Sequence, residues 1–116
     1  MFFTLTNTVS ILDNRKKFSI SNHYSMSISR QNLSIVIVTI KSEKVIHKCI
    51  KSIQENIPIV VVENSSDHDI KKSLESNYKN VTCIVTGENM GMGAGNNMGI
   101  RSAKTDYVYI INPDVT

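Results

Sequence analysis

The groups best suited to chemistry in this sequence follow apolar runs of the chain. The tripeptide Asn112-Pro113-Asp114 comes directly after the run from Tyr107 to Ile111. Asp114 offers a hard carboxylate oxygen of the kind that Mg²⁺ or Mn²⁺ prefers, and Asn112 could add a neutral contact. The same tripeptide is also an ordinary turn former, because proline fixes φ and asparagine or aspartate can make Asx turns. A metal site and a plain turn both fit these residues.

A second acidic group, Glu63, ends an apolar run that contains three consecutive valines. A carboxylate there can accept a hydrogen bond from the N–H of a planar ring, such as the imide of uracil or thymine. The alternative is an acid that caps a helix or lies on the surface, since loops commonly carry polar side chains. His68 stands between Asp67 and Asp69, where a solvated histidine at a helix start explains the pattern better than a metal ligand does.

The glycine-rich segment 87–99, GENMGMGAGNNMG, invites comparison with phosphate-binding loops. A dinucleotide-binding GxGxxG pattern that starts at Gly91 needs glycine at Asn96, and one that starts at Gly93 needs glycine at Met98. Neither pattern fits, and the lack of a GK[ST] sequence excludes a P-loop. The segment predicts either a helix N-terminus that suits an anion or glycines that only let the loop turn tightly against a sheet.

The composition is that of a globular domain. The chain has 116 residues, 41% of them hydrophobic and 20% charged, which is room for one domain with one modest core. No apolar run approaches the roughly 18 residues that a membrane-spanning helix needs. Cys49 and Cys83 lie far apart and form no CxxC pair, which argues against a zinc site and fits buried thiols in a reducing compartment.

The net charge of +3 lies entirely in the leader, residues 1–32, which holds four basic side chains and one acidic one. Residues 33–116 hold nine of each, so the body has no basic excess for binding nucleic acid. The leader is rich in Ser, Asn and Thr, lacks periodicity and is expected to be a poorly ordered extension. Alternatively, its Arg15-Lys16-Lys17 could rest on an anionic membrane surface.

Strands and helices are predicted to alternate from Leu33 onward. Continuous β-branched runs predict buried strands at 33–40, 57–64, 81–86 and 106–111. Ser42 can cap a first helix, Asp67 or Asp69 a second, and a third is expected to end near Ala103. Apolar residues recur at helical spacing in the first helix, at Val45, Ile46, Cys49, Ile50 and Ile53.

This β-α-β-α-β-α-β order predicts an α/β fold, with a mostly parallel sheet and helices on both faces. In such sheets ligands bind beyond the carboxyl ends of the strands. The polar groups at 39–41, 63–67, 87–97 and 112–114 all follow predicted strands. We therefore expect them to meet at one edge of the sheet.

Taken in order, these four strand ends resemble the nucleotide-binding half of a family 2 glycosyltransferase with the GT-A fold. The resemblance covers about residues 33–116 and rests on SIVIVTIKS, VVVENSSD, ENMGMGAGNNMGI and DYVYIINPDV. It is strongest to the branch with Asn-Pro-Asp at the metal position, in which rhamnosyltransferases that use dTDP-rhamnose are common. The implied fold is the Rossmann-like half of a GT-A domain over 33–116.

The resemblance also implies roles for individual residues. The resemblance assigns nucleotide binding to Thr39, Glu63, Asn64, Asn89, Gly91 and Asn97. Glu63 matches the acid that contacts the base, while Asn112 and Asp114 match the first and last positions of the DxD metal motif, which implies Mg²⁺ or Mn²⁺. Ile40-Lys41 replace the family's usual Tyr-Asn, and the neutral Asn112 makes metal binding depend more on the substrate diphosphate.

The implied activity is inverting transfer of a sugar from a UDP- or dTDP-linked donor to a hydroxyl of a saccharide or lipid-linked acceptor. Such transfer would serve cell-surface polysaccharide synthesis in the cytoplasm, at the inner face of the membrane. The family's acceptor site and base follow the DxD motif, so the catalytic base is expected beyond Thr116. The chain is expected to be a truncated, inactive fragment that self-associates through its last strand. The alternatives are a noncatalytic nucleotide-binding or interaction module and a Rossmann-type oxidoreductase.

Overall fold

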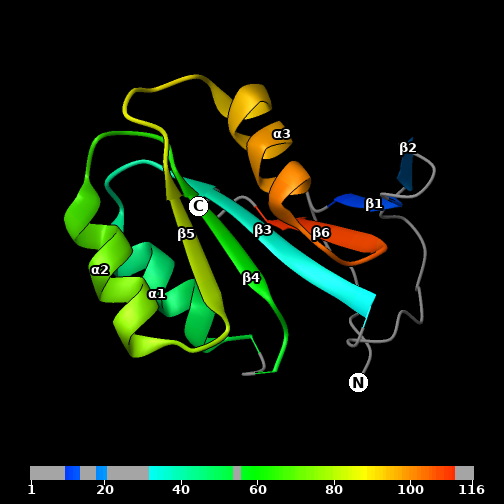
Figure 1. Cartoon of the computed structure of the whole chain (residues 1–116), viewed down its shortest axis with the longest axis horizontal. Helices are drawn as coiled ribbons and strands as arrows, with labels where there is room; N and C mark the ends of the chain where they lie inside the picture. Colours follow the sequence, from blue (N-terminus) through cyan, green and yellow to red (C-terminus); the bar gives the residue numbers. More distant parts are fainter. Residues whose placement is uncertain (1–9, 14–17, 21–31, 54–55, 112–116) are drawn as a thin grey trace.

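The structure is a computed structural model that describes residues 10–13, 18–20, 32–53 and 56–111. Three helices and six strands alternate along most of this length (Figure 1). The strands are β1 (Ser10–Asp13), β2 (Phe18–Ile20), β3 (Leu33–Thr39), β4 (Ile59–Glu63), β5 (Val81–Val85) and β6 (Tyr107–Ile111), and the helices are α1 (Glu43–Lys51), α2 (His68–Asn77) and α3 (Met92–Ser102).

All six strands belong to one sheet in the order β2-β1-β6-β3-β4-β5. The four strands from β6 to β5 are parallel, and β1 runs antiparallel to both β6 and β2. Thr39 is in register with Glu63, and Glu63 is in register with Val85. The predicted α/β fold with a mostly parallel sheet is confirmed, and the carboxyl ends of β3, β4 and β5 lie side by side.

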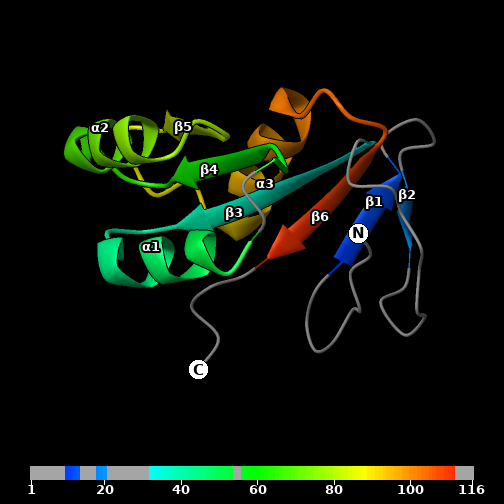
Figure 2. The same cartoon turned by 90° about the horizontal axis from the view of Figure 1, so that it is seen from below.

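The helices cover both faces of the sheet, as Figures 1 and 2 show together. Successive side chains of a strand point to opposite faces, so the buried residues of β3 and β4 contribute to two hydrophobic cores, one on each face of the sheet. Helices α1 and α2 pack on one face over a cluster that includes Ile35, Ile37, Ile46, Ile50, Val61, Ile70 and Leu74. Helix α3 packs on the other face over Val36, Val38, Val60, Val62 and Val108.

Helix α3 approaches the sheet closely because two of its buried residues are glycines. A Cβ atom added to Gly95 would lie 2.9 Å from Cγ1 of Val38, and one added to Gly99 would overlap Cγ1 of Val36. Both valines are buried and β-branched, so they have little room to yield. Part of the glycine-rich run therefore serves helix–sheet packing, a use that neither of the two alternatives for that segment includes.

We expect Gly99→Ala to lower the free energy of unfolding by about 1–3 kcal/mol, the usual cost of overpacking a filled core. Gly93→Ala is the matched control, because a Cβ at Gly93 meets nothing within 4 Å. In an exposed helix position alanine should stabilise by up to about 1 kcal/mol relative to glycine. Urea unfolding of both variants measures the difference. Equal destabilisation by the two changes would contradict the close packing of α3.

Two pieces of the leader are ordered into the sheet as β1 and β2, whereas the sequence predicts a poorly ordered extension. These strands are four and three residues long, too short to give a recognisable alternation of polar and apolar residues. The other residues of 1–31 lie outside the described part of the chain. Strand β1 pairs with β6 from Ser10↔Ile110 to Asp13↔Tyr107, so the edge of the last strand, through which self-association is expected, is covered by another strand of the same chain.

The outer edge of β5 is covered by side chains of α2. The carboxylate of Glu75 accepts a hydrogen bond from the Cys83 N–H at 2.8 Å, and Lys71 Nζ donates to the Cys83 carbonyl at 2.6 Å. The Cys83 N–H and then Lys71 lower the pKa of Glu75, while burial raises the pKa of the Cys83 thiol to about 11. Both cysteines are free thiols, and the edge strand is shielded from pairing with another chain.

The first two helices agree with the sequence predictions except at one cap and at one apolar position. Asp67 caps α2 by accepting from the N–H groups of Asp69 and Ile70. Ser42 precedes α1, but its hydroxyl donates to the Ile40 carbonyl instead of capping the helix. Val45 was expected on the apolar face of α1, yet it is 42% exposed, because Ile46 and Ile50 already fill that face.

Candidate functional site

The carboxyl ends of β3, β4 and β5 bring several of the predicted site residues together. Thr39 ends β3, and Glu63 and Asn64 end β4 and begin the loop beyond it. The main-chain N–H of Asn64 donates to the Thr39 carbonyl at 2.8 Å. The loop from β5 to α3 reaches the same edge, because its Gly87 N–H donates to the Ser65 carbonyl at 2.9 Å.

Glu63 is fully buried, with an exposed fraction of 0%. Its two carboxylate oxygens each lie 3.2 Å from the backbone nitrogen of Lys41, and the Ser65 hydroxyl donates to one of them. Lys41 has a φ of 47°, in the left-handed region that non-glycine residues seldom adopt. In this conformation the Lys41 N–H faces the carboxylate, and Glu63 thereby holds the turn between β3 and α1.

Thr39 is also fully buried, and its hydroxyl has no hydrogen-bond partner among the described residues. A buried hydroxyl without a partner costs about 1–3 kcal/mol, so native structures seldom contain one without a reason. Thr39 is the registered neighbour of Glu63 across the two parallel strands. An unused hydroxyl therefore lies next to a buried carboxylate at the edge where ligands of parallel sheets bind.

Asn64 uses its side chain to organise the loop between β5 and α3. Its amide nitrogen donates to the Gly91 carbonyl at 3.0 Å and to Asn89 Oδ1 at 3.4 Å. Its amide oxygen accepts from the Met90 N–H at 2.9 Å and from the Thr86 hydroxyl at 3.1 Å. With an exposed fraction of 1%, Asn64 is built into the protein and holds this loop in place.

Three other predicted site residues lie on this loop and on α3, and all three are exposed. Asn89 Oδ1 accepts from the Gly91 N–H at 2.9 Å, which makes an Asx turn before the helix. Gly91 has a φ of 87° and is the N-cap residue of α3, so the turn requires glycine there. Asn97 lies on α3 beyond the first turn. Asn89 and Gly91 lie at the strand-end edge, because both are hydrogen-bonded to the side chain of Asn64. Asn97 does not join them, since it lies between the buried Gly95 and Gly99 on the exposed side of α3.

Four residues of this region were missed by the sequence analysis as site residues. Lys41 and Ser65 are the partners of Glu63, and Thr86 is a partner of Asn64. Asn96 on α3 has a buried amide oxygen that no donor in the described part of the chain meets. Ser65 follows Glu63 at a spacing of two, a signal that sequence reasoning could have used. The role of Lys41 depends on a backbone N–H, which the residue type does not reveal.

The predicted metal residues, Asn112 and Asp114, lie outside the described part of the chain. Strand β6 ends at Ile111, which is in register with Ile37 of β3. Within the described ranges, no three His, Cys, Asp or Glu side chains are grouped to hold a metal ion. His68 is exposed at the start of α2, in agreement with a solvated helix start.

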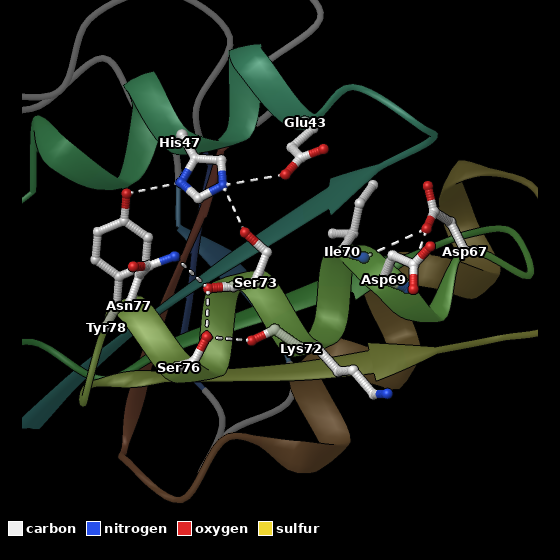
Figure 3. Close-up of polar contacts among 10 residues, drawn as sticks. All are labelled: Glu43, His47, Asp67, Asp69, Ile70, Lys72, Ser73, Ser76, Asn77 and Tyr78. Carbon is white, nitrogen blue, oxygen red and sulfur yellow. Dashed lines mark hydrogen bonds and ion pairs between the residues drawn. The ribbon is translucent and has the colours of Figure 1, made fainter.

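A separate polar cluster joins α1 to α2 on the face of the sheet that these two helices cover (Figure 3). His47 Nδ1 lies 2.8 Å from the Tyr78 hydroxyl, and His47 Nε2 lies 3.2 Å from the Ser73 hydroxyl. The carboxylate of Glu43 lies 3.7 Å from the same Nε2 atom. Serine and glutamate thus face one ring nitrogen, whereas a hydrolase triad needs them on opposite nitrogens. The cluster links two helices and is not a triad.

Comparison with known proteins assigns the chain to a family. A search of curated proteins gave no match. Residues 34–116 match the family described as Glycosyl transferase family 2, and this range begins with β3 and includes all the residues of the candidate site. Because the match covers most of the 116 residues, the chain belongs to glycosyl transferase family 2.

Proposed function

We propose that the strand-end site binds the nucleotide of a UDP- or dTDP-sugar for transfer to a hydroxyl of a saccharide or lipid-linked acceptor. Membership of glycosyl transferase family 2 supports sugar transfer in general. The observation that carries the nucleotide part is the buried Thr39 hydroxyl without a partner, next to the buried carboxylate of Glu63. This pair offers one unused hydrogen-bonding group and one carboxylate at the edge where such folds bind ligands.

We propose that Glu63 accepts the imide N–H of a uracil or thymine base. That contact takes the place of the Lys41 N–H, whose two distances of 3.2 Å are at the long end of the range for hydrogen bonds. The left-handed Lys41 costs about 1 kcal/mol or more in backbone energy, which favours release of the turn.

The diphosphate and the metal are assigned to the residues that follow β6 in the sequence. Asp114 and Asn112 supply a carboxylate and an amide oxygen, a donor set that suits Mg²⁺ or Mn²⁺ with substrate phosphate completing the coordination. When bound, the ion would stabilise the charge on the departing diphosphate. The Asn-Pro-Asp sequence is the one feature on which we propose the rhamnosyltransferase-like branch. Inverting chemistry, a role in cell-surface polysaccharide synthesis and a cytoplasmic site of action belong to the same proposal.

A thermal-shift panel tests the proposal against its alternatives. UDP or dTDP with Mn²⁺ should raise the melting temperature, since a ligand at about 100 times its Kd stabilises by about 2.7 kcal/mol. Stabilisation by NAD alone would instead indicate an oxidoreductase. A folded chain that responds to none of these ligands would be a noncatalytic interaction module.

Asp114→Asn removes the carboxylate of the proposed metal pair. We expect it to abolish the Mn²⁺-dependent part of the nucleotide response and to leave the metal-free response to uridine or thymidine unchanged. Asp106→Asn is the matched control, because Asp106 precedes β6 at the opposite edge of the sheet. Equal loss in the two variants, or an unchanged metal effect in Asp114→Asn, would remove Asp114 from the metal site.

A further inference from the structure

The positive charge of the described residues is concentrated on α1 and the residue pair before it. Segment 41–51 holds four lysines and one acid, a formal charge of +3. The other described residues hold five basic and seven acidic side chains, a formal charge of −2. The even balance of residues 33–116 therefore hides a charge asymmetry in space, which becomes visible only when the fold places α1 on one side of the sheet (Figure 2).

The lysines of α1 share the outer side of the helix. Ile46 and Ile50 are buried against the sheet, and Lys44, Lys48 and Lys51 follow one another at spacings of four and three residues, which aligns them on one stripe. All three are exposed. They also line a single groove on this side of the molecule, together with Glu43 and His47.

The one acid of the segment, Glu43, lines the same groove as the three lysines. Glu43 and His47 point toward α2, where the carboxylate lies 3.7 Å from His47 Nε2 (Figure 3). On α2, the charged side chains Lys71 and Glu75 pair with each other at 2.9 Å. The groove on α1 therefore holds three lysines and one described acid, a formal charge of +2.

Two exposed aliphatic side chains stand at the start of the same helix. Ile40 is 40% exposed and Val45 is 42% exposed. We propose that α1 docks the protein on an anionic lipid surface, with its lysine stripe on the headgroups and with Ile40 and Val45 at the boundary of the acyl chains. Amphipathic helices with lysine on one side and aliphatic residues beside it bind membranes in this way.

The residue types favour lipid over nucleic acid. The stripe contains lysine but no arginine, and arginine is preferred where phosphates are held by bidentate contacts. Segment 40–51 contains no Phe, Trp or Tyr, and the one ring that it carries, that of His47, is hydrogen-bonded to Tyr78 and Ser73, so the segment is a poor platform for stacked bases. Lysines on a straight helix instead suit a laterally fluid array of negative headgroups.

Docking through α1 would orient the candidate site. The Lys41 N–H contacts Glu63, so the start of α1 adjoins the strand-end edge. An acceptor carried by a lipid would then meet the protein on the side where the donor site opens. This last step rests on the proposed function, whereas the docking itself does not. No helix in the described ranges is long and apolar enough to cross a bilayer, and the contact is peripheral.

The test is co-flotation of the full chain with vesicles of phosphatidylcholine plus phosphatidylglycerol, and with vesicles of phosphatidylcholine alone. Each lysine near an anionic surface strengthens binding roughly fivefold. The triple variant Lys44→Gln, Lys48→Gln, Lys51→Gln should therefore bind on the order of 100-fold more weakly. The control changes Lys72, Lys79 and Lys104 to Gln, which removes the same charge from three exposed lysines elsewhere and should leave most of the binding intact.

A third variant changes Arg15, Lys16 and Lys17 to Gln and tests the leader as the competing source of binding. The proposal is overturned if this variant loses vesicle binding while the α1 variant keeps it. It is also overturned if the α1 and control variants weaken binding equally, if the chain binds neutral vesicles as well as anionic ones, or if it binds single-stranded RNA but not anionic vesicles. No nucleotide enters this experiment, so its failure leaves the proposed function untouched.

Discussion

Replacing Glu63 with alanine is expected to lower the free energy of unfolding by about 3–5 kcal/mol. The carboxylate accepts from the Lys41 N–H and from the Ser65 hydroxyl, and hydrogen bonds to a charged group contribute about 1.5–3 kcal/mol each. Alanine leaves both donors in a buried site without an acceptor. Urea unfolding followed by circular dichroism measures the loss.

Glu88→Ala is the control for this change, because Glu88 lies on the exposed loop after β5 and should alter stability by less than about 0.5 kcal/mol. Glu63→Gln retains one acceptor oxygen and is the variant for ligand studies. It should weaken binding of uridine or thymidine by about 1.5–3 kcal/mol, with or without metal. A Glu63→Ala protein as stable as Glu88→Ala would show that the buried carboxylate does not hold the β3–α1 turn.

Replacing Asn64 with leucine is expected to cost about 2–4 kcal/mol of stability. Leucine is similar in size, but it loses four hydrogen bonds to the loop that precedes α3, each worth about 1 kcal/mol. The loop should also open locally. Hydrogen exchange at the Met90 amide, which donates to Asn64 Oδ1, should accelerate more than exchange in β3 and β4.

The conservative variant Asn64→Asp separates positioning from general stability. It keeps the acceptor for the Met90 N–H and the Thr86 hydroxyl, but it loses the donor to the Gly91 carbonyl. Protection of the Met90 amide should therefore be higher in Asn64→Asp than in Asn64→Leu. Nucleotide affinity should differ between the two variants in the same direction. Asn97→Leu, at an exposed position of α3, is the control for stability. If Met90 stays as protected in Asn64→Leu as in the unmodified chain, Asn64 does not organise this loop.

The sheet and its three helices could be predicted from the sequence because their signals are local. The four parallel strands show as apolar runs rich in β-branched residues, although only β3 and β4 are buried along their whole length. Two of the helices carry apolar residues at helical spacing. Asp67 could be identified as a cap for the same reason. Strands β1 and β2 could not, since seven residues in two pieces carry too little pattern. Their pairing next to β6 depends on contacts between the two ends of the described chain.

The site could be predicted by position but not by contact. Strand order alone places Thr39, Glu63 and the loop near Gly91 at one edge. The sequence does not show that Glu63 and Asn64 are buried and already hydrogen-bonded, because those bonds go to the backbone of Lys41, Met90 and Gly91. The lysine stripe escaped notice for a similar reason: its charge cancels in the sequence and separates only in the fold.

Amide chemical shifts during a titration with dTDP or UDP and Mg²⁺ test the central claim most directly, since they report where a ligand binds. Our account predicts that the largest changes cluster at the carboxyl ends of β3 and β4 and at the start of α3, with Lys41, Ser65 and Met92 among them. The amides at the opposite edge of the sheet, such as those of Asn80 and Lys104, should shift little. Largest changes at that opposite edge, or none in a folded chain at millimolar nucleotide, would contradict a nucleotide site at the strand ends.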